Sequence, residues 1–130
     1  MSTILLVDDS RVTREVIKIF LVGRGMRILE AGDGREALDL MHEYHPDLVV
    51  TDFDMPVLDG LGLCEAIRGD LRIWKTPVVI LSGTATPEQA RRCKGAGARE
   101  VLTKPVQRHL LLEALDRYLP QRTGLHAPEP

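Results

Sequence analysis

The sequence predicts an α/β fold of five strand–helix units, (βα)5, in which a doubly wound five-stranded parallel sheet carries helices on both faces. The first observation behind this prediction is that short apolar runs alternate with amphipathic stretches along the whole chain. The second is that the runs are short and mostly apolar, as strands buried on both faces of a parallel sheet are. The third is size and composition, because 130 residues with 44% hydrophobic and 28% charged side chains suit one globular domain.

Five short runs are predicted to be strands because they are apolar and rich in β-branched residues. They are Ile4–Val7, Arg27–Ala31, Leu48–Thr51, Val78–Leu81 and Glu100–Thr103. None approaches the roughly 20 apolar residues that span a bilayer. The first run stops at two aspartates, unlike a signal peptide, so we expect no membrane contact.

The segments between the strands have the spacing of amphipathic helices. The first helix is predicted over Ser10–Val22, where apolar residues recur at offsets of three and four: Val12, Val16, Ile19 and Phe20. The second is predicted over Arg35–Tyr44 and the third over Leu61–Arg68.

The fourth helix has clear start and stop signals. Thr86 is its predicted N-cap, Pro87 takes the first helical position, and Gly95 and Gly97 end it. The fifth helix is predicted over Gln107–Leu119. Residues 1–120 are thus predicted to form one domain. Residues 121–130 lack an apolar pattern and are predicted to be a flexible C-terminal tail or the start of a linker.

Composition excludes some classes of protein. The formal net charge of -2 excludes a generally basic chain that binds nucleic acid directly. The two cysteines, Cys64 and Cys93, form no CxxC pair and are predicted to be buried thiols, which favours a cytoplasmic location.

Charge is unevenly distributed along the sequence. Residues 1–90 hold 9 basic and 15 acidic side chains, whereas residues 91–122 hold 8 basic and 3 acidic ones. The basic last third suits either solvated helix faces or an acidic partner.

Polar residues follow four of the five predicted strands. Asp8 and Asp9 follow the first strand, Asp52 the third, Ser82 the fourth and Lys104 the fifth. Ligands of open α/β sheets bind beyond the carboxyl ends of the strands, where the strand order reverses. The sequence therefore predicts one site at which acids, a hydroxyl and an amine meet.

This set of groups suits phosphoryl chemistry. Packed carboxylates repel one another, and a divalent cation relieves the repulsion. Hard oxygen ligands favour Mg²⁺. An aspartate kept ionised beside Mg²⁺ is a nucleophile toward a phosphoryl group, whose oxygens the metal and Lys104 would neutralise. The plainer interpretation is that the aspartates only cap loops and helix starts.

Four motifs, in this order and spacing, resemble the receiver domain of response regulators, the phospho-accepting module of two-component signalling. They are ILLVDDS, VVTDFDMPVLDG, VVILSG and VLTKP, at the ends of the first, third, fourth and fifth strands. The resemblance covers about residues 2–119. It implies a flavodoxin-like, chemotaxis-regulator-like receiver fold, Mg²⁺ as cofactor, and a phosphoprotein that is not a turnover enzyme.

The resemblance also implies roles for the strand-end residues. Asp52 would be the phospho-acceptor, Lys104 would pair with the acyl phosphate, and Ser82 would move toward it. Asp9 and Asp52 would be direct Mg²⁺ ligands, and Asp8 would complete the acidic pocket indirectly.

Loop residues have implied roles as well. The backbone carbonyl of Asp54 would be a further Mg²⁺ ligand. Asp54 and Thr84 stand at positions that tune the lifetime of the phosphoryl group in the family. The bond before Pro105 is expected to be cis, and Pro56 and Gly60 shape the loop that leads into the third helix.

Two positions depart from the family pattern. Val101 stands where the family usually has Tyr or Phe, whose ring turns inward on activation, and Val106 replaces a common Phe. A ring-based switch is therefore not expected in its usual form. We expect the loop backbone to transmit activation instead.

The partners follow from the resemblance. A sensor histidine kinase or a phosphotransfer protein is expected to donate the phosphoryl group. The output partner is unknown, and the face formed by the fourth helix, fifth strand and fifth helix is its predicted contact surface. Phosphorylation-dependent dimerisation stays open.

Two other functions remain as alternatives. One is a receiver-like interaction module that is never phosphorylated, which only Val101 favours. The other is a haloacid-dehalogenase-like phosphatase, suggested by the pair Asp52 and Asp54. That class has the motif at its first strand and a second acidic cluster after the lysine, whereas only Glu113, Asp116 and Glu129 follow Lys104 here.

Overall fold

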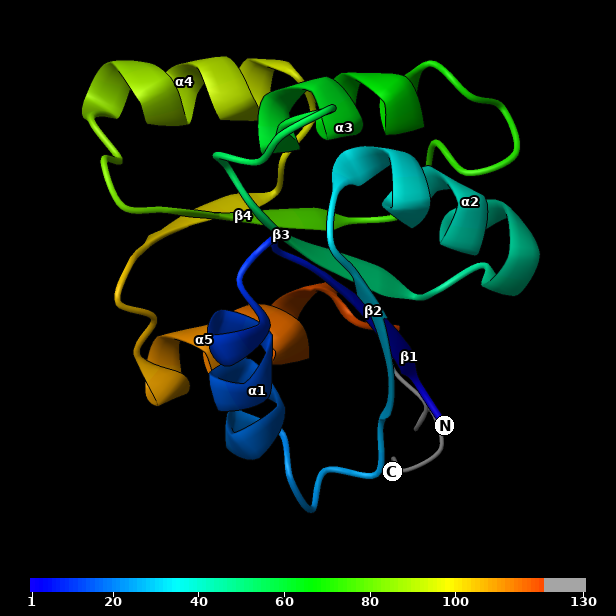
Figure 1. The fold of residues 1–130 in the computed structure, drawn as a ribbon, viewed down its shortest axis with the longest axis vertical. Coiled ribbons are helices and arrows are strands. Elements are labelled where there is room, and N and C mark those ends of the chain that lie inside the picture. The colour runs from blue at the N-terminus through cyan, green and yellow to red at the C-terminus, as the bar shows by residue number, and fades with distance from the viewer. Residues whose placement is uncertain (121–130) are drawn as a thin grey trace, which may run out of the picture.

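Residues 1–120 are described by the computed structural model, and the predicted tail, residues 121–130, lies outside the described residues. Five strands and five helices alternate along residues 1–120. The strands form one parallel sheet in the order β2-β1-β3-β4-β5, with helices on both faces (Figure 1). The predicted doubly wound (βα)5 fold is confirmed.

Predicted and observed elements agree within one or two residues at each end. The strands are β1 (Thr3–Val7), β2 (Arg27–Ala31), β3 (Leu48–Asp52), β4 (Val78–Ser82) and β5 (Glu100–Thr103). The helices are α1 (Arg11–Phe20), α2 (Gly34–Tyr44), α3 (Gly60–Arg68), α4 (Pro87–Gly95) and α5 (Arg108–Tyr118). β3 and β4 each run one residue further than predicted, because Asp52 still pairs with Leu81 and Ser82 with Thr103.

Side-chain caps fix where four helices begin. Ser10, Asp33, Asp59 and Thr86 each accept a hydrogen bond from the backbone N–H three residues later. A cap of this kind stabilises a helix by about 1 kcal/mol. The cap of α1 directly follows the two aspartates at the end of β1, so it also fixes the chain beside the predicted site.

The sheet separates two apolar cores. Helices α1 and α5 cover one face, and α2, α3 and α4 cover the other (Figure 1). Successive residues of β3 point to opposite faces, so Val49 lies in the core of α2–α4 while Leu48 and Val50 lie in that of α1 and α5. Cys64 and Cys93 are fully buried free thiols, as predicted. Within residues 1–120 no helix has the length and apolarity needed to cross a membrane.

Of the four apolar residues whose spacing predicted α1, Phe20 packs on the core but the other three do not. Val12, Val16 and Ile19 are 73%, 42% and 67% exposed, whereas Ile17 and Leu21 are buried. These three exposed residues form a surface strip, called the α1 stripe below. The helix also ends at Phe20 rather than at the predicted Val22, because the chain turns over the next residues.

Ion pairs to β2 support the orientation of α1. Arg14 Nε lies 2.9 Å from Glu30 Oε1, and Lys18 Nζ lies 2.8 Å from Glu30 Oε2. Glu30 belongs to β2, so these contacts turn that side of α1 toward the sheet edge. Ile17, which lies between the two cations along the helix, then faces the core and the α1 stripe faces solvent.

Asp70, in the loop after α3, is expected to make folding stability pH-dependent in acid. The backbone N–H of Arg72 and then the His42 side chain, 2.6 Å away, lower the pKa of Asp70 to about 2, below its ordinary 3.8. The folded pKa is depressed, so the stabilising contribution is complete above about pH 4 and is lost as the pH falls toward 2. Urea unfolding at several pH values should show a higher free energy of unfolding for the native chain than for Asp70→Asn at pH 5. That difference should disappear as the pH falls from about 4 toward 2. A stability difference that stays constant there would contradict the assignment.

Candidate functional site

The strand pairing brings the predicted site residues to one edge of the sheet. Asp52 ends β3 and Ser82 ends β4, while Asp8 directly follows β1 and Lys104 directly follows β5. Because all strands are parallel, their carboxyl ends share this edge. The backbone N–H of Lys104 donates to the carbonyl of Ser82 at 2.9 Å, which fixes β5 against β4 at this edge.

Three carboxylates form the centre of the site. Asp8, Asp9 and Asp52 each place one carboxylate oxygen within 4.8 Å of the others. Asp8 and Asp52 are 3% and 7% exposed, whereas Asp9 is exposed. Lys104 Nζ lies 2.9 Å from Asp52 Oδ1 and 3.1 Å from Asp8 Oδ2. One ammonium group is therefore shared between the two buried acids.

Burial and like charge work against the ionised form of Asp52. Burial raises the pKa of Asp52, the hydrogen bond from Lys104 lowers it, and the charges of Asp8 and Asp9 raise it, with a net shift upward. Burial alone lowers the pKa of Lys104, but its hydrogen bonds and charge interactions with Asp52 and Asp8 outweigh burial and raise it. A second cation would relieve the repulsion that Lys104 leaves.

The acidic cluster fits Mg²⁺. Its donors are carboxylate oxygens, the ligands this hard cation prefers. The open side, where Asp9 is exposed, leaves room for the water molecules that Mg²⁺ usually keeps. Asp54 lies two residues beyond β3 and is exposed, and its role as a carbonyl ligand stays a prediction.

Three loop and strand positions singled out in the sequence lie beside the site. The bond between Lys104 and Pro105 is cis, as predicted. Gly60 lies against the backbone of Asp52 and Phe53 and starts α3, so the loop containing Pro56 returns directly to the end of β3. Val101 is half-buried and packs on the core of α2, α3 and α4.

Ser82 does not point a free hydroxyl toward Asp52. Its side chain is fully buried, and its Oγ donates to Gln89 Oε1 at 2.6 Å. The same oxygen accepts the backbone N–H of Thr84 at 3.1 Å. The sequence did not single out Gln89, because no motif marks a glutamine at that position as part of a site.

Arg14 is a second residue that sequence reasoning missed. Its Nη1 donates to the backbone carbonyl of Asp8, while its Nε binds Glu30 at 2.9 Å. A cation on α1 therefore holds the main chain of the acidic cluster in place. The sequence offered no signal for this contact, since it depends on how α1 lies against β2.

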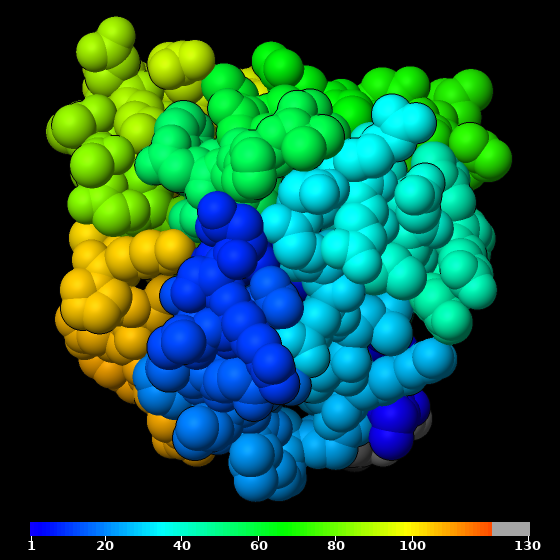
Figure 2. Space-filling view, in the orientation of Figure 1, coloured from blue at the N-terminus to red at the C-terminus, as the bar shows by residue number. Residues whose placement is uncertain are grey.

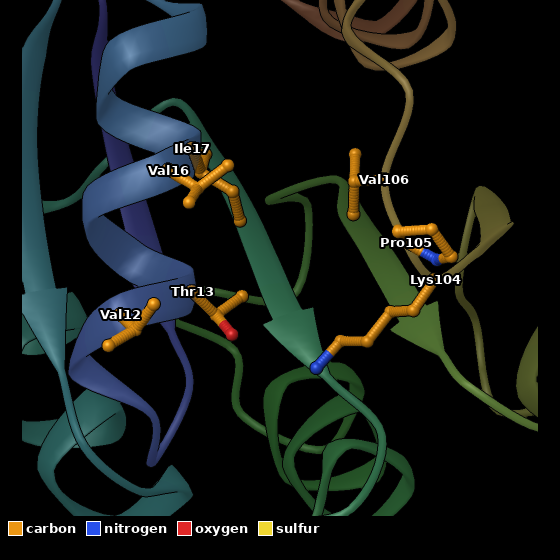
Figure 3. A pocket seen from close by; sticks show the side chains of 7 residues that line it. All are labelled: Val12, Thr13, Val16, Ile17, Lys104, Pro105 and Val106. Atoms are coloured by element: carbon orange, nitrogen blue, oxygen red, sulfur yellow. The ribbon is translucent and has the colours of Figure 1, made fainter.

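An apolar groove opens beside the site. It has a volume of about 200 Å³ and lies between α1 and the segment that follows β5, with Lys104 at one end. Figure 3 shows Val12 and Val16 on α1 facing Val106 and Pro105 across this groove. Figure 2 shows α1, in blue, lying at the surface next to the orange segment after β5. Part of the α1 stripe thus borders the site.

Known proteins share this arrangement. The sequence model of a family described as "Response regulator receiver domain" matches residues 4–126. The chemotaxis protein CheY of Pseudomonas aeruginosa is 33% identical over 122 residues, which are 93% of this chain and 98% of that protein. The gliding motility regulatory protein of Myxococcus xanthus and the sensory/regulatory protein RpfC of Xanthomonas campestris, each 37% identical over 115 residues, are much longer, and the chain spans 15% and 16% of their length.

Solved structures agree with these sequence matches. The chemotaxis protein CheY4 of Vibrio cholerae superposes with a TM-score of 0.84 at 34% identity, covering 92% of this chain and 99% of that one. The receiver domain of the sensor histidine kinase PA1611 of Pseudomonas aeruginosa has a TM-score of 0.81 at 31% identity, covering 90% of this chain and 96% of that one. Its structure has a magnesium ion coordinated in the active site cleft.

Proposed function

Since the chain belongs to the response regulator receiver family, as the match to residues 4–126 shows, we propose that Asp52 accepts the phosphoryl group from a histidine kinase or a phosphotransfer protein. One observation carries this assignment. Asp52 is the acid that is buried at the end of the central strand β3, lies in the acidic cluster and also binds Lys104. We assign residues 1–120 to the receiver domain.

The chemistry follows from the positions of these groups. Lys104 holds Oδ1 of Asp52, so the other carboxylate oxygen attacks the phosphorus of the donor phosphohistidine. A phosphorus–oxygen bond forms, the phosphorus–nitrogen bond breaks, and the electron pair leaves with the donor imidazole. Mg²⁺, held by Asp9 and Asp52 with Asp8 nearby, would supply positive charge to the phosphoryl oxygens. Lys104 supplies the second positive charge from the other side.

The donor has to reach Asp52 across the surface around the site. The groove lined by Val12, Val16 and Val106 ends at Lys104, so a protein that presents a phosphohistidine to Asp52 covers this groove. Its apolar lining would then be buried, which favours the complex.

The two buried, free cysteines suit a reducing compartment, and we therefore place the reaction in the cytoplasm.

For the output, we propose the surface of α4, β5 and α5. Arg91, Arg92 and Lys94 are exposed on α4 and Arg108 is exposed at the start of α5. This basic surface suits an acidic partner. Helix α4 begins a few residues after Ser82 and α5 begins a few residues after Lys104, so a change at the site has a short path to both helices.

Replacing Asp52 with asparagine is expected to abolish phosphorylation. Native chain incubated with acetyl phosphate and Mg²⁺ should gain the mass of one phosphoryl group, whereas Asp52→Asn should gain none because an amide is a poor nucleophile. Intact-mass spectrometry measures both, and omission of Mg²⁺ is the matched control. Failure of the native chain to take up phosphate from acetyl phosphate and from a phosphorylated donor protein, together with no Mg²⁺ binding, would favour the phosphorylation-independent interaction module.

A further inference from the structure

Gln89 has no role in the phosphoryl transfer proposed above, yet it binds a residue of the site. The hydroxyl of the buried Ser82 donates to Gln89 Oε1 at 2.6 Å. A serine hydroxyl has a single proton to donate. In this arrangement Ser82 therefore has no proton left for a phosphoryl oxygen on Asp52.

Gln89 also connects Ser82 to the loop and helix that follow β4. Its Nε2 donates to Thr84 Oγ1 at 3.4 Å, and its backbone N–H donates to Thr86 Oγ1 at 3.1 Å. One side chain thus links the end of β4, the β4–α4 loop and the first turn of α4. Cys93 is the one residue of α4 that is buried, so few packed side chains hold this helix in place.

We infer that Gln89 is a positioning residue that competes with a phosphoryl group on Asp52 for the hydroxyl of Ser82. The inference rests on the proposed function, since it needs the phosphoryl group on Asp52. When Ser82 turns to that group, its bond to Gln89 breaks, and the start of α4 loses a contact with the sheet. Phosphorylation and the position of α4 are therefore coupled through one hydrogen bond.

This coupling needs no aromatic ring. Position 101 holds a valine, half-buried in the same core as Cys93 of α4, and it has no group that could bind a hydroxyl. The contact between Ser82 and Gln89 joins the site to α4 without it. Gln89 is therefore the residue that transmits activation in this chain. It follows the β4–α4 loop, whose backbone was expected to move in place of a ring.

Beryllium fluoride in the presence of Mg²⁺ tests the competition, because the anion coordinates an aspartate carboxylate as a phosphoryl group does. Calorimetric titration should show that Gln89→Leu, which cannot accept the hydroxyl proton, binds about two to ten times more tightly than the native chain. Gln89→Glu keeps an acceptor and should not tighten binding. Gln107→Leu makes the same change at an exposed glutamine whose side chain does not cap α5, and it is the matched control, with an expected change below about twofold.

A second titration series in a Ser82→Ala background separates competition from a structural effect. Gln89→Leu should change the affinity there by less than about twofold, because no hydroxyl is left to release. Equal tightening in both backgrounds would overturn the inference, as would an unchanged affinity in Gln89→Leu with only a lower melting temperature. Absence of binding to the native chain, or binding that survives Asp52→Asn, would instead overturn the proposed function.

Discussion

Replacing Lys104 with methionine is expected to lower the free energy of unfolding by about 2–3 kcal/mol when no Mg²⁺ is present. The ammonium group of Lys104 lies within 3.1 Å of both Asp52 and Asp8, whose side chains are 9% and 4% exposed. Its removal leaves two buried carboxylates with no cation between them. Lys104 itself is 26% exposed, so solvent screens part of the loss.

Added Mg²⁺ should return part of that stability, because a cation at the acidic cluster replaces the missing charge. Urea unfolding of native chain and Lys104→Met, each with and without Mg²⁺, measures this. Lys94→Met, which removes an exposed lysine of α4, is the matched control with an expected change within about 0.5 kcal/mol. If the loss in Lys104→Met were equal with and without Mg²⁺, its cause would be the packing of the aliphatic stem and not the charge.

A methyl group at Gly60 is expected to cost about 2–3 kcal/mol of stability. A Cβ there would overlap the carbonyl oxygen of Asp52 and lie 3.0 Å from the Cα of Phe53. Both contacts are with backbone, and the N–H of Gly60 also donates to the carbonyl of Phe53 at 2.9 Å, so the two segments cannot separate cheaply. Gly60→Ala should therefore also weaken Mg²⁺ binding, because the end of β3 has to move.

Gly95→Ala is the matched control for Gly60→Ala. Gly95 is the last residue of α4, and a Cβ there would meet nothing within 4 Å. Alanine is expected to raise stability by about 0.5–1 kcal/mol because it reduces the freedom of the unfolded chain. Thermal unfolding and Mg²⁺ titration of both variants measure the contrast. Equal Mg²⁺ affinity in Gly60→Ala and native chain would show that the end of β3 does not shift.

The meeting of the site residues at the strand ends was predictable because it follows from the topology of the sheet. Once the strands are parallel, Asp8, Asp52 and Lys104 must share an edge of the sheet, whatever the details of packing. The fold and the acidic cluster could therefore be predicted from the sequence. The roles of Asp54 and Thr84 stay predictions, since they concern a bound metal and a bound phosphoryl group.

The orientation of α1 was not predictable in the same way. The helix has apolar residues on two sides, and spacing alone cannot show which side packs. Ile17 and Leu21 are the residues that pack, and the ion pair between Arg14 and Glu30, sixteen residues further on, holds the helix in the matching orientation. The bond between Ser82 and Gln89 is similar, because it depends on side-chain conformations across a loop and not on any local pattern.

The two cores on opposite faces of the sheet also bear on how proteins of this kind diversify. Residues that line the groove beside α1 belong to one side, and Gln89 and α4 belong to the other, with only the sheet between them. Substitutions far apart and without shared partners usually add in their effects. Duplicated copies of such a gene can therefore change the groove that the phosphoryl donor covers and the α4 part of the output surface in separate steps, whereas α5 lies on the groove's own side of the sheet. Neither change forces a compensating one on the opposite face.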